Sequence, residues 1–328
     1  MTTVVKAGTP AALLGLVPAM LGYQPESSVV YVAMNGTRSV GAMRFDIPAP
    51  GDEKPFAATS IGLLCRIEQI DRMIVITYAN DRQARVHAAI QEHARNAGLG
   101  IVDSLFVTDA VFGLHTDPVS TVQPISSIEL NPNLPVVTAR NTVPALPAPV
   151  QDVDVHTELQ LSPTTSLVRF IDSIASDGVP DDLSADDVSR FLRIAVHPLL
   201  REAMLHTLIG GPELGNLTFQ AQSDLRNGGV YPEGLSEVLK GKAPRPEHQR
   251  FENVLELARI AAASSSDEYR QGALSVCAWI SWATGYSTRA LGYIAMGAVN
   301  DLSTTVEQLV HRSVLPDWMF ESNQTEEG

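Results

Sequence analysis

Polar side chains gather around a turn near the start of the chain. Residues 22–28 read Gly-Tyr-Gln-Pro-Glu-Ser-Ser and stand between an apolar helical pattern and a β-branched run. Loop residues that a rigid scaffold positions often bind ligands, and the ligand-binding candidates here are Tyr23, Glu26 and Ser28. A structural turn, in which glycine stops the helix and serine satisfies backbone groups, accounts for the same residues.

Arg44 and Asp46 form a second candidate feature. They stand two residues apart in a predicted strand, so their side chains share one face. In a ligand site beside the turn, Arg44 would fix an anion, and Asp46 or Glu26 would handle a proton. Ser28 would hydrogen-bond the ligand. An ion pair at a sheet edge is the structural alternative.

Other chemistries lack their usual signatures. The sequence contains no phosphate loop, dinucleotide-binding glycine pattern or nucleophile elbow. The histidines show no metal-ligand spacing, so we predict no metal site and no cofactor. The aspartates from Asp177 to Asp187 lack the spacing of a calcium loop and favour a solvated helix start. Catalytic residues stay unassigned, and the sequence leaves open whether the protein is an enzyme.

The first third of the chain must position these residues, and its pattern predicts an α/β domain with a mixed sheet over residues 1–112. Thr9-Pro10 predicts a helix start and Gly22 its end, while Asn35-Gly36 predicts a hairpin. The later helices are expected at 55–69 and 81–97, and the strands at 28–34, 39–47, 72–79 and 101–108.

The rest of the chain predicts an all-helical C-terminal domain. Prolines break the pattern after residue 112, so 113–162 is expected to be an irregular connector. Residues 163–320 have a helical period, and 321–328 form a polar tail. Trp279 and Trp282 belong to a helix pair that resembles a tetratricopeptide-type hairpin, with a plain helical hairpin as the alternative. Helices are expected at 199–208, 212–226, 233–240, 246–264, 267–284, 287–299 and 303–315.

Composition sets the class of protein. A length of 328 residues predicts about two domains, and 45% hydrophobic with 18% charged residues indicates a globular chain. The acidic balance, a formal net charge of −14 without a Lys/Arg cluster, argues against bulk binding to nucleic acid or anionic membranes.

The start lacks the pattern of a signal peptide and no apolar run is long enough for a membrane span, so we expect a cytoplasmic protein. Cys65 and Cys277 are expected to be reduced, buried thiols.

Four blocks of sequence resemble one family. Gly8-Thr-Pro-Ala-Ala-Leu-Leu, followed by Leu21-Gly-Tyr-Gln-Pro-Glu-Ser-Ser-Val-Val, resembles the opening of the family called domain of unknown function 4192. The blocks that begin at Arg44, His197 and Trp279 resemble later parts of it. The resemblance implies the fold and a source among actinobacteria or their phages, and it implies no reaction.

Two classes of function fit these residues. The first, which the sequence favours, is a non-enzymatic interaction or regulatory protein that binds a protein partner or a second copy of itself. Its expected partner-binding residues, exposed around a groove, are Trp279, Trp282, Tyr286 and Tyr293. The second is a small-molecule-binding protein or enzyme, with a deep pocket between residues 22–28 and the Arg44–Asp46 strand and the proline-rich segment as a lid.

Overall fold

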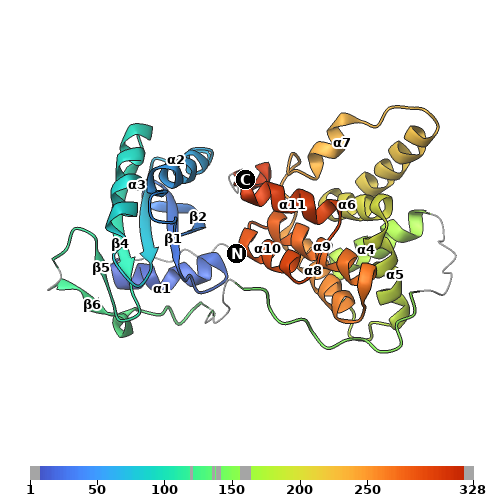
Figure 1. Ribbon diagram of the computed structural model, residues 1–328, viewed down its shortest axis with the longest axis horizontal. Coiled ribbons are helices and arrows are strands. Elements are labelled where there is room, and N and C mark those ends of the chain that lie inside the picture. Colours follow the sequence, from blue (N-terminus) through green and yellow to red (C-terminus); the bar gives the residue numbers. More distant parts are fainter. Residues whose placement is uncertain (1–7, 119–120, 135–136, 138–141, 156–163, 321–328) are drawn as a thin grey trace. The chain divides into compact units, whose positions relative to one another are not determined.

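The computed structural model describes residues 8–118, 121–134, 137, 142–155 and 164–320 (Figure 1). These residues divide into two compact units, one within residues 8–141 and the other within residues 142–320. The division falls inside the expected connector, and residues on its two sides pack against different units. The first unit is α/β and the second is helical, which confirms the predicted fold class.

The N-terminal unit is built on a mixed sheet of six strands in the order β2-β1-β3-β4-β5-β6. Only the β3–β4 pair among these strands is parallel, and α3 makes the crossover between them. The strands are β1 (Ser28–Asn35), β2 (Arg38–Asp46), β3 (Arg72–Tyr78), β4 (Gly100–Val107), β5 (Val111–Leu114) and β6 (Gln123–Pro124).

The first helix begins and ends as its sequence predicts. Helix α1 (Pro10–Leu21) starts after Thr9, whose hydroxyl accepts a hydrogen bond from the Ala12 amide at 3.1 Å. Pro18 lies within the helix, and Gly22 ends it in the left-handed conformation with φ 76°, which glycine adopts without steric cost. This ending directs the chain into the turn that precedes β1.

Helices cover both faces of the sheet. Helices α2 (Glu53–Leu64) and α3 (Ala84–Ala97) pack side by side over the face that carries Val29, Tyr31 and Val75 (Figure 1). Because side chains alternate along a strand, Val30 and Ile76 point to the opposite face, where α1 packs. Burial on both sides explains the continuous apolar runs of β1 and β3.

The structure corrects some expected details of this unit. Helix α2 ends at Leu64 rather than at residue 69, and α3 begins at Ala84 because residues 79–83 form the loop after β3. Both cysteines are free, but Cys65 follows α2 on the surface and is exposed, so its expected burial was wrong; Cys277 is buried. A short 3-10 helix, η2 (Ile125–Ser127), follows β6 in the proline-rich segment.

The helical unit is held by one large apolar core. Residue 210 has non-helical angles and Gly211 has φ 73° and ψ −168°, so α6 is two helices that meet at this glycine pair. Its helices are α4 (Thr164–Asp177), α5 (Ala185–Val196), α6 (Pro198–Arg226), α7 (Glu233–Val238), α8 (His248–Ala263), α9 (Asp267–Ala283), α10 (Ser287–Ala295), α11 (Asp301–His311) and the 3-10 helix η3 (Asp317–Met319).

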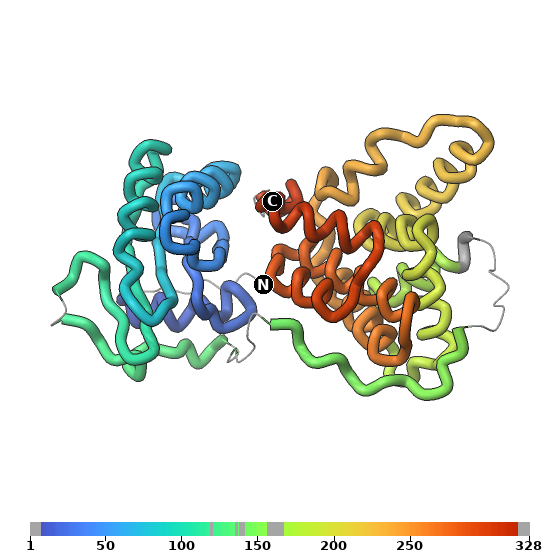
Figure 2. Tube along the Cα trace, viewed as in Figure 1, coloured from blue at the N-terminus to red at the C-terminus, as the bar shows by residue number. Residues whose placement is uncertain are grey.

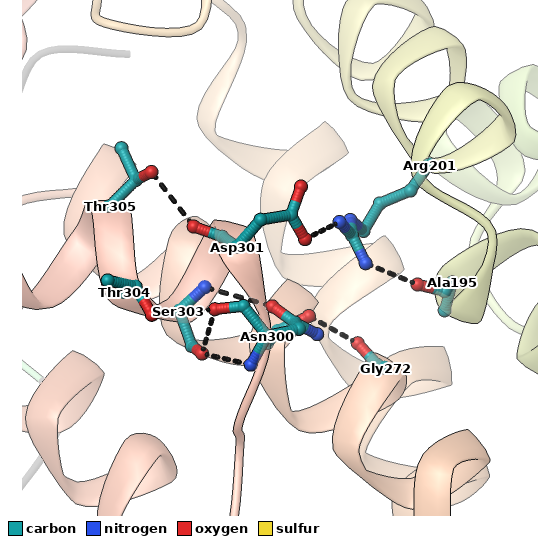
Figure 3. Close-up of polar contacts among 9 residues, drawn as sticks. Ala195, Arg201, Gly272, Asn300, Asp301, Ser303, Thr304 and Thr305 are labelled. Atoms are coloured by element: carbon teal, nitrogen blue, oxygen red, sulfur yellow. Dashed lines mark hydrogen bonds and ion pairs between the residues drawn. The ribbon is translucent and has the colours of Figure 1, made fainter.

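A buried arginine ties three of these helices together (Figure 3). Arg201, in the first turn of α6, has a side chain only 4% exposed. It donates to the carbonyl oxygen of Ala195 in α5 at 3.1 Å and forms an ion pair with Asp301 at the start of α11. Asn300 and Ser303 form a capping box that fixes this end of α11. The junction is a structural link between helices.

Helices α9 and α10 follow each other in the chain and pack together, so the predicted helix pair is present. Its likeness to a tetratricopeptide repeat stays a prediction. Helix α10 ends at Ala295, four residues earlier than expected, and Gly297 follows with φ 112°. The extended chain from residue 142 to 155 runs beside the helices and packs apolar side chains, including Val143 and Val150, against their core (Figure 2). No helix among the residues described here is long and apolar enough to cross a membrane.

Candidate ligand-binding site in the N-terminal unit

The turn between α1 and β1 holds its residues in a restrained conformation. Gly22 starts the turn, and Ser27, with φ 44°, lies in the left-handed region that non-glycine residues rarely adopt. Tyr23 is 5% exposed and therefore packs into the unit. Such strain persists only where the surrounding structure fixes the backbone, and it is common at functional sites.

The register of the sheet brings three chemically active side chains to one place. Ser28 lies directly opposite Asp46 of β2 and directly opposite Tyr78 of β3. Directly opposed residues of antiparallel strands share a face and have their Cβ atoms roughly 5 Å apart. Ser28, Asp46 and Tyr78 therefore stand together on the face that α1 covers.

The two hydroxyl groups of this set are buried without a hydrogen-bond partner. Ser28 is fully buried, and neither its Oγ atom nor the hydroxyl oxygen of Tyr78 has a partner. Burial raises the pKa of Tyr78 above its ordinary value, so the phenol stays protonated and can both donate and accept. A buried polar group without a hydrogen-bond partner lowers the stability of a fold by about 1–3 kcal/mol. Two such groups occur here, on facing residues.

Arg44 neutralises the carboxylate beside these hydroxyls and fixes the turn. Its side chain is only 9% exposed and contacts the carboxylate of Asp46 at 2.6 Å, whereas the Asp46 side chain is 74% exposed. The same guanidinium donates to the carbonyl oxygen of Glu26 at 3.2 Å. The ion pair that the spacing predicted is therefore present, and it holds residue 26 against β2.

The structure brings together most of the predicted ligand-binding residues, though not in every predicted role. The backbone carbonyl of Glu26 accepts a hydrogen bond from Arg44, and the residue is exposed. Arg44 binds Asp46, and its predicted part in fixing an anion stays a prediction. Tyr78 was missed: only the pairing of β1 with β3 places it opposite Ser28, and strand register cannot be read from one sequence.

Part of the proline-rich segment lies against the same turn. The side-chain amide of Gln24 donates a hydrogen bond to the carbonyl oxygen of Val137 at 2.6 Å. The backbone amide of Glu129 donates to the carbonyl oxygen of Ala11 in α1 at 3.3 Å. The Glu129 carbonyl approaches Gly15 so closely that a Cβ atom there would lie 2.0 Å from its oxygen. The segment thus runs along α1 and reaches the turn, and its role as a lid stays a prediction.

The aromatic residues predicted to bind a partner lie mostly in the core of the helical unit. Trp279, Trp282 and Tyr293 are at most 1% exposed, and only Tyr286 is half-buried. The indole nitrogens of Trp279 and Trp282 donate to the carbonyl oxygens of Leu239 and Val314. The expectation of an exposed aromatic groove was therefore wrong for these three rings, because they fill the space between helices instead.

No group of three or more histidine, cysteine or carboxylate side chains in the described ranges is arranged to hold a metal ion. Two histidines that the sequence left unassigned do meet in the N-terminal unit. The rings of His87 and His115 stack with their centroids 3.9 Å apart. Their Nε2 atoms hydrogen-bond to the hydroxyls of Ser104 and Thr77, the latter at 3.2 Å.

The comparison with known families agrees with the resemblance. Residues 10–120 match the family described as Domain of unknown function (DUF4192). This part of the chain, which contains α1, β1, β2 and the residues of the candidate site, is therefore a domain of that family. No curated protein and no solved structure matches the chain.

Proposed function

We propose that the N-terminal unit binds a small polar molecule through the hydroxyl groups of Ser28 and Tyr78. The observation that carries the proposal is the pair of buried, unpartnered hydroxyls on two residues that the β1–β3 register places opposite each other. A ligand group that accepts a hydrogen bond from one of these hydroxyls and donates a hydrogen bond to the other would remove both desolvation costs. The bonded Arg44–Asp46 pair favours an uncharged polar group over an anion here.

Native mass spectrometry of protein purified gently from its natural source tests this function. We expect a discrete small-molecule adduct on the wild-type chain that is lost in Tyr78→Phe and in Ser28→Ala. Tyr31→Phe is the matched control, because the Tyr31 hydroxyl is bonded to Ser60 at 2.9 Å on the opposite face of β1. An unmodified wild-type mass, or an adduct that survives in the double variant, would contradict the proposal.

The interaction or regulatory function stays a prediction, and the same spectrum addresses it. A partner subunit or a closed homo-oligomer would appear as a larger mass with or without the adduct. From the resemblance and the sequence pattern alone, we further propose that the protein comes from an actinobacterium or one of its phages and works in the cytoplasm. Fractionation of the natural host would test that location.

A further inference from the structure

Helices α8 and α10 of the helical unit carry two arginines whose charges act on one buried hydroxyl, and Arg289 stands one helical turn before Tyr293 on α10. Arg259 lies on α8, while Arg289 and Tyr293 lie on α10. The charges of both guanidiniums act on the Tyr293 hydroxyl, as does the more weakly acting carboxylate of Glu252. We call Arg259, Arg289 and Tyr293 the arginine–tyrosine cluster.

The Tyr293 hydroxyl is a donor without an acceptor. The residue is fully buried, and its hydroxyl oxygen has no hydrogen-bond partner. Burial raises the pKa of Tyr293 above its ordinary value despite the two nearby arginines, which lower it. The group is therefore protonated at neutral pH and available to donate.

Both arginines also have an unused donor on the buried side. Arg259 donates from Nη2 to the carbonyl oxygen of Ala145 at 2.7 Å, and its Nε atom is buried without a partner. Arg289 lies over the Tyr286 ring, 4.4 Å from its centroid, and its Nε atom is likewise buried and unpartnered. Within the part of the chain that the structure describes, neither guanidinium forms an ion pair with a carboxylate.

The cluster offers three hydrogen-bond donors and two positive charges, and no acceptor among the described residues is bound to these donors. A ligand that fits it must therefore accept hydrogen bonds and carry a negative charge. An Nε and an Nη atom of one guanidinium form the edge that holds two oxygens of a carboxylate or phosphate. The chain carries a formal net charge of −14, so its overall field repels anions and only a local site of this kind would retain one. We propose that the arginine–tyrosine cluster binds a small oxyanion.

The nearby charged groups are compatible with this ligand. Glu252 is the one carboxylate that acts on Tyr293 from α8, and it contacts His248 at 3.7 Å rather than either arginine. Cys277, on α9, interacts electrostatically with Arg259 and Tyr293, and burial raises the pKa of its thiol. The thiol therefore adds no negative charge that would compete with an oxyanion.

Isothermal titration of the full-length chain in chloride buffer at pH 7 tests the site. Inorganic phosphate and acetate are the two probes, because they separate a phosphate ligand from a carboxylate ligand of the same oxyanion chemistry. We expect saturable binding of at least one probe. Arg289→Gln and Tyr293→Phe are each expected to weaken it at least about 10-fold, the loss of one charge-assisted hydrogen bond.

Arg190→Gln is the matched control. Arg190 belongs to the same unit and lies over an aromatic ring, 5.0 Å from the centroid of Phe170, but it has the carboxylate of Asp187 at 3.9 Å. The control removes the same charge and should leave the affinity unchanged. Equal weakening by Arg190→Gln and Arg289→Gln, or no saturable binding of either probe at about 10 mM, would overturn the site. A thermal unfolding curve for each variant confirms that the chain still folds.

Discussion

The Arg201 junction and the arginine–tyrosine cluster lie in the same helical unit and use the same cation in opposite ways. Arg201 has a carboxylate and a backbone carbonyl as partners, and it links α5, α6 and α11. Arg259 has one backbone carbonyl, and Arg289 has an aromatic ring. The first region is satisfied by the chain itself, whereas the second keeps unpaired donors.

These arginines of the helical unit thus fall into two groups, those whose guanidinium is bonded to a carboxylate and those with an unpartnered buried donor atom. Arg250 behaves like Arg201, because it binds Asp172 at 2.8 Å, Ser176 at 2.9 Å and the Thr207 carbonyl at 3.0 Å. Arg259 and Arg289 are partly buried, but a buried donor atom without an acceptor, such as the Nε of each, is still costly, so a fold retains one only where its surroundings or a ligand compensate. The comparison therefore predicts that bonded arginines control stability and unbonded ones control binding.

Loss of Arg201 should have the largest effect on stability. Arg201→Ala removes a buried side chain, an ion pair and the hydrogen bond to Ala195, so we expect a loss of about 3 kcal/mol in the free energy of unfolding. All three tryptophans belong to the helical unit, and urea unfolding followed by tryptophan fluorescence reports on it. Asp301→Asn keeps an amide oxygen as acceptor and the bond to Ala195 but removes the counter-charge of the buried guanidinium, so it should cost less, about 2 kcal/mol. Equal effects of the two changes would contradict a role centred on the buried guanidinium.

The stacked histidines extend the comparison to the N-terminal unit, where the charge of Arg82 acts on His115 and the guanidinium donates to the backbone carbonyl of Asp117 at 2.9 Å. Arg82 lies 4.3 Å from the centroid of Phe106, and its Nη2 atom is buried and unpartnered. Burial, followed by the charges of His87 and Arg82, lowers the pKa of His115 from its usual 6.5 to about 4. Burial lowers the pKa of His87 as well.

A fall in pH should therefore destabilise this unit. Between pH 6.5 and pH 4 the unfolded chain binds a proton at His115 that the folded chain excludes, so the free energy of unfolding falls as the pH falls through this window. Amide hydrogen exchange of β1 and β3 measures the effect within the unit. His115→Gln should make the decline shallower, and an unchanged slope in this variant would refute the assignment.

Local signals predicted the elements, because they depend on neighbouring residues. Thr9, Pro10 and Gly22 marked the ends of α1, and Asn35-Gly36 marked the β1–β2 hairpin, as the structure confirms. The Arg44–Asp46 pair followed from two-residue spacing on one strand. The sequence could not show that Trp279 and Trp282 are buried, because an aromatic stripe reads alike whether it faces solvent or another helix.

Contacts between distant residues account for what the sequence missed. Tyr78 joins Ser28 only through the register of two antiparallel strands. The charge of Arg259 acts on Tyr293 only because residues of α8 and α10 belong to the same core, although the two residues are far apart in the chain. No spacing rule connects such pairs, so their unpartnered atoms become visible only in three dimensions.

Removal of an unpartnered hydroxyl should stabilise the ligand-free protein. Tyr78→Phe keeps the buried ring and deletes only the hydroxyl oxygen, so we expect a gain of about 1 kcal/mol in the free energy of unfolding of the N-terminal unit. Tyr31→Phe deletes a bonded hydroxyl and should instead lose about 1 kcal/mol. Hydrogen exchange of β1 and β3 compares the two. A loss of stability in both variants would indicate that Tyr78 has a structural partner.

The smallest expected effect is the sharpest test of the comparison. Arg289→Gln removes a cation that has no carboxylate partner in the described residues, so we expect a change within about 0.5 kcal/mol in the stability of the helical unit. Tryptophan fluorescence in urea gives that value beside the one for Arg201→Ala. If Arg289 instead supported the fold as Arg201 does, its loss would lower the unfolding midpoint comparably. A near-zero effect on folding together with loss of oxyanion affinity is the combination that only a binding arginine produces.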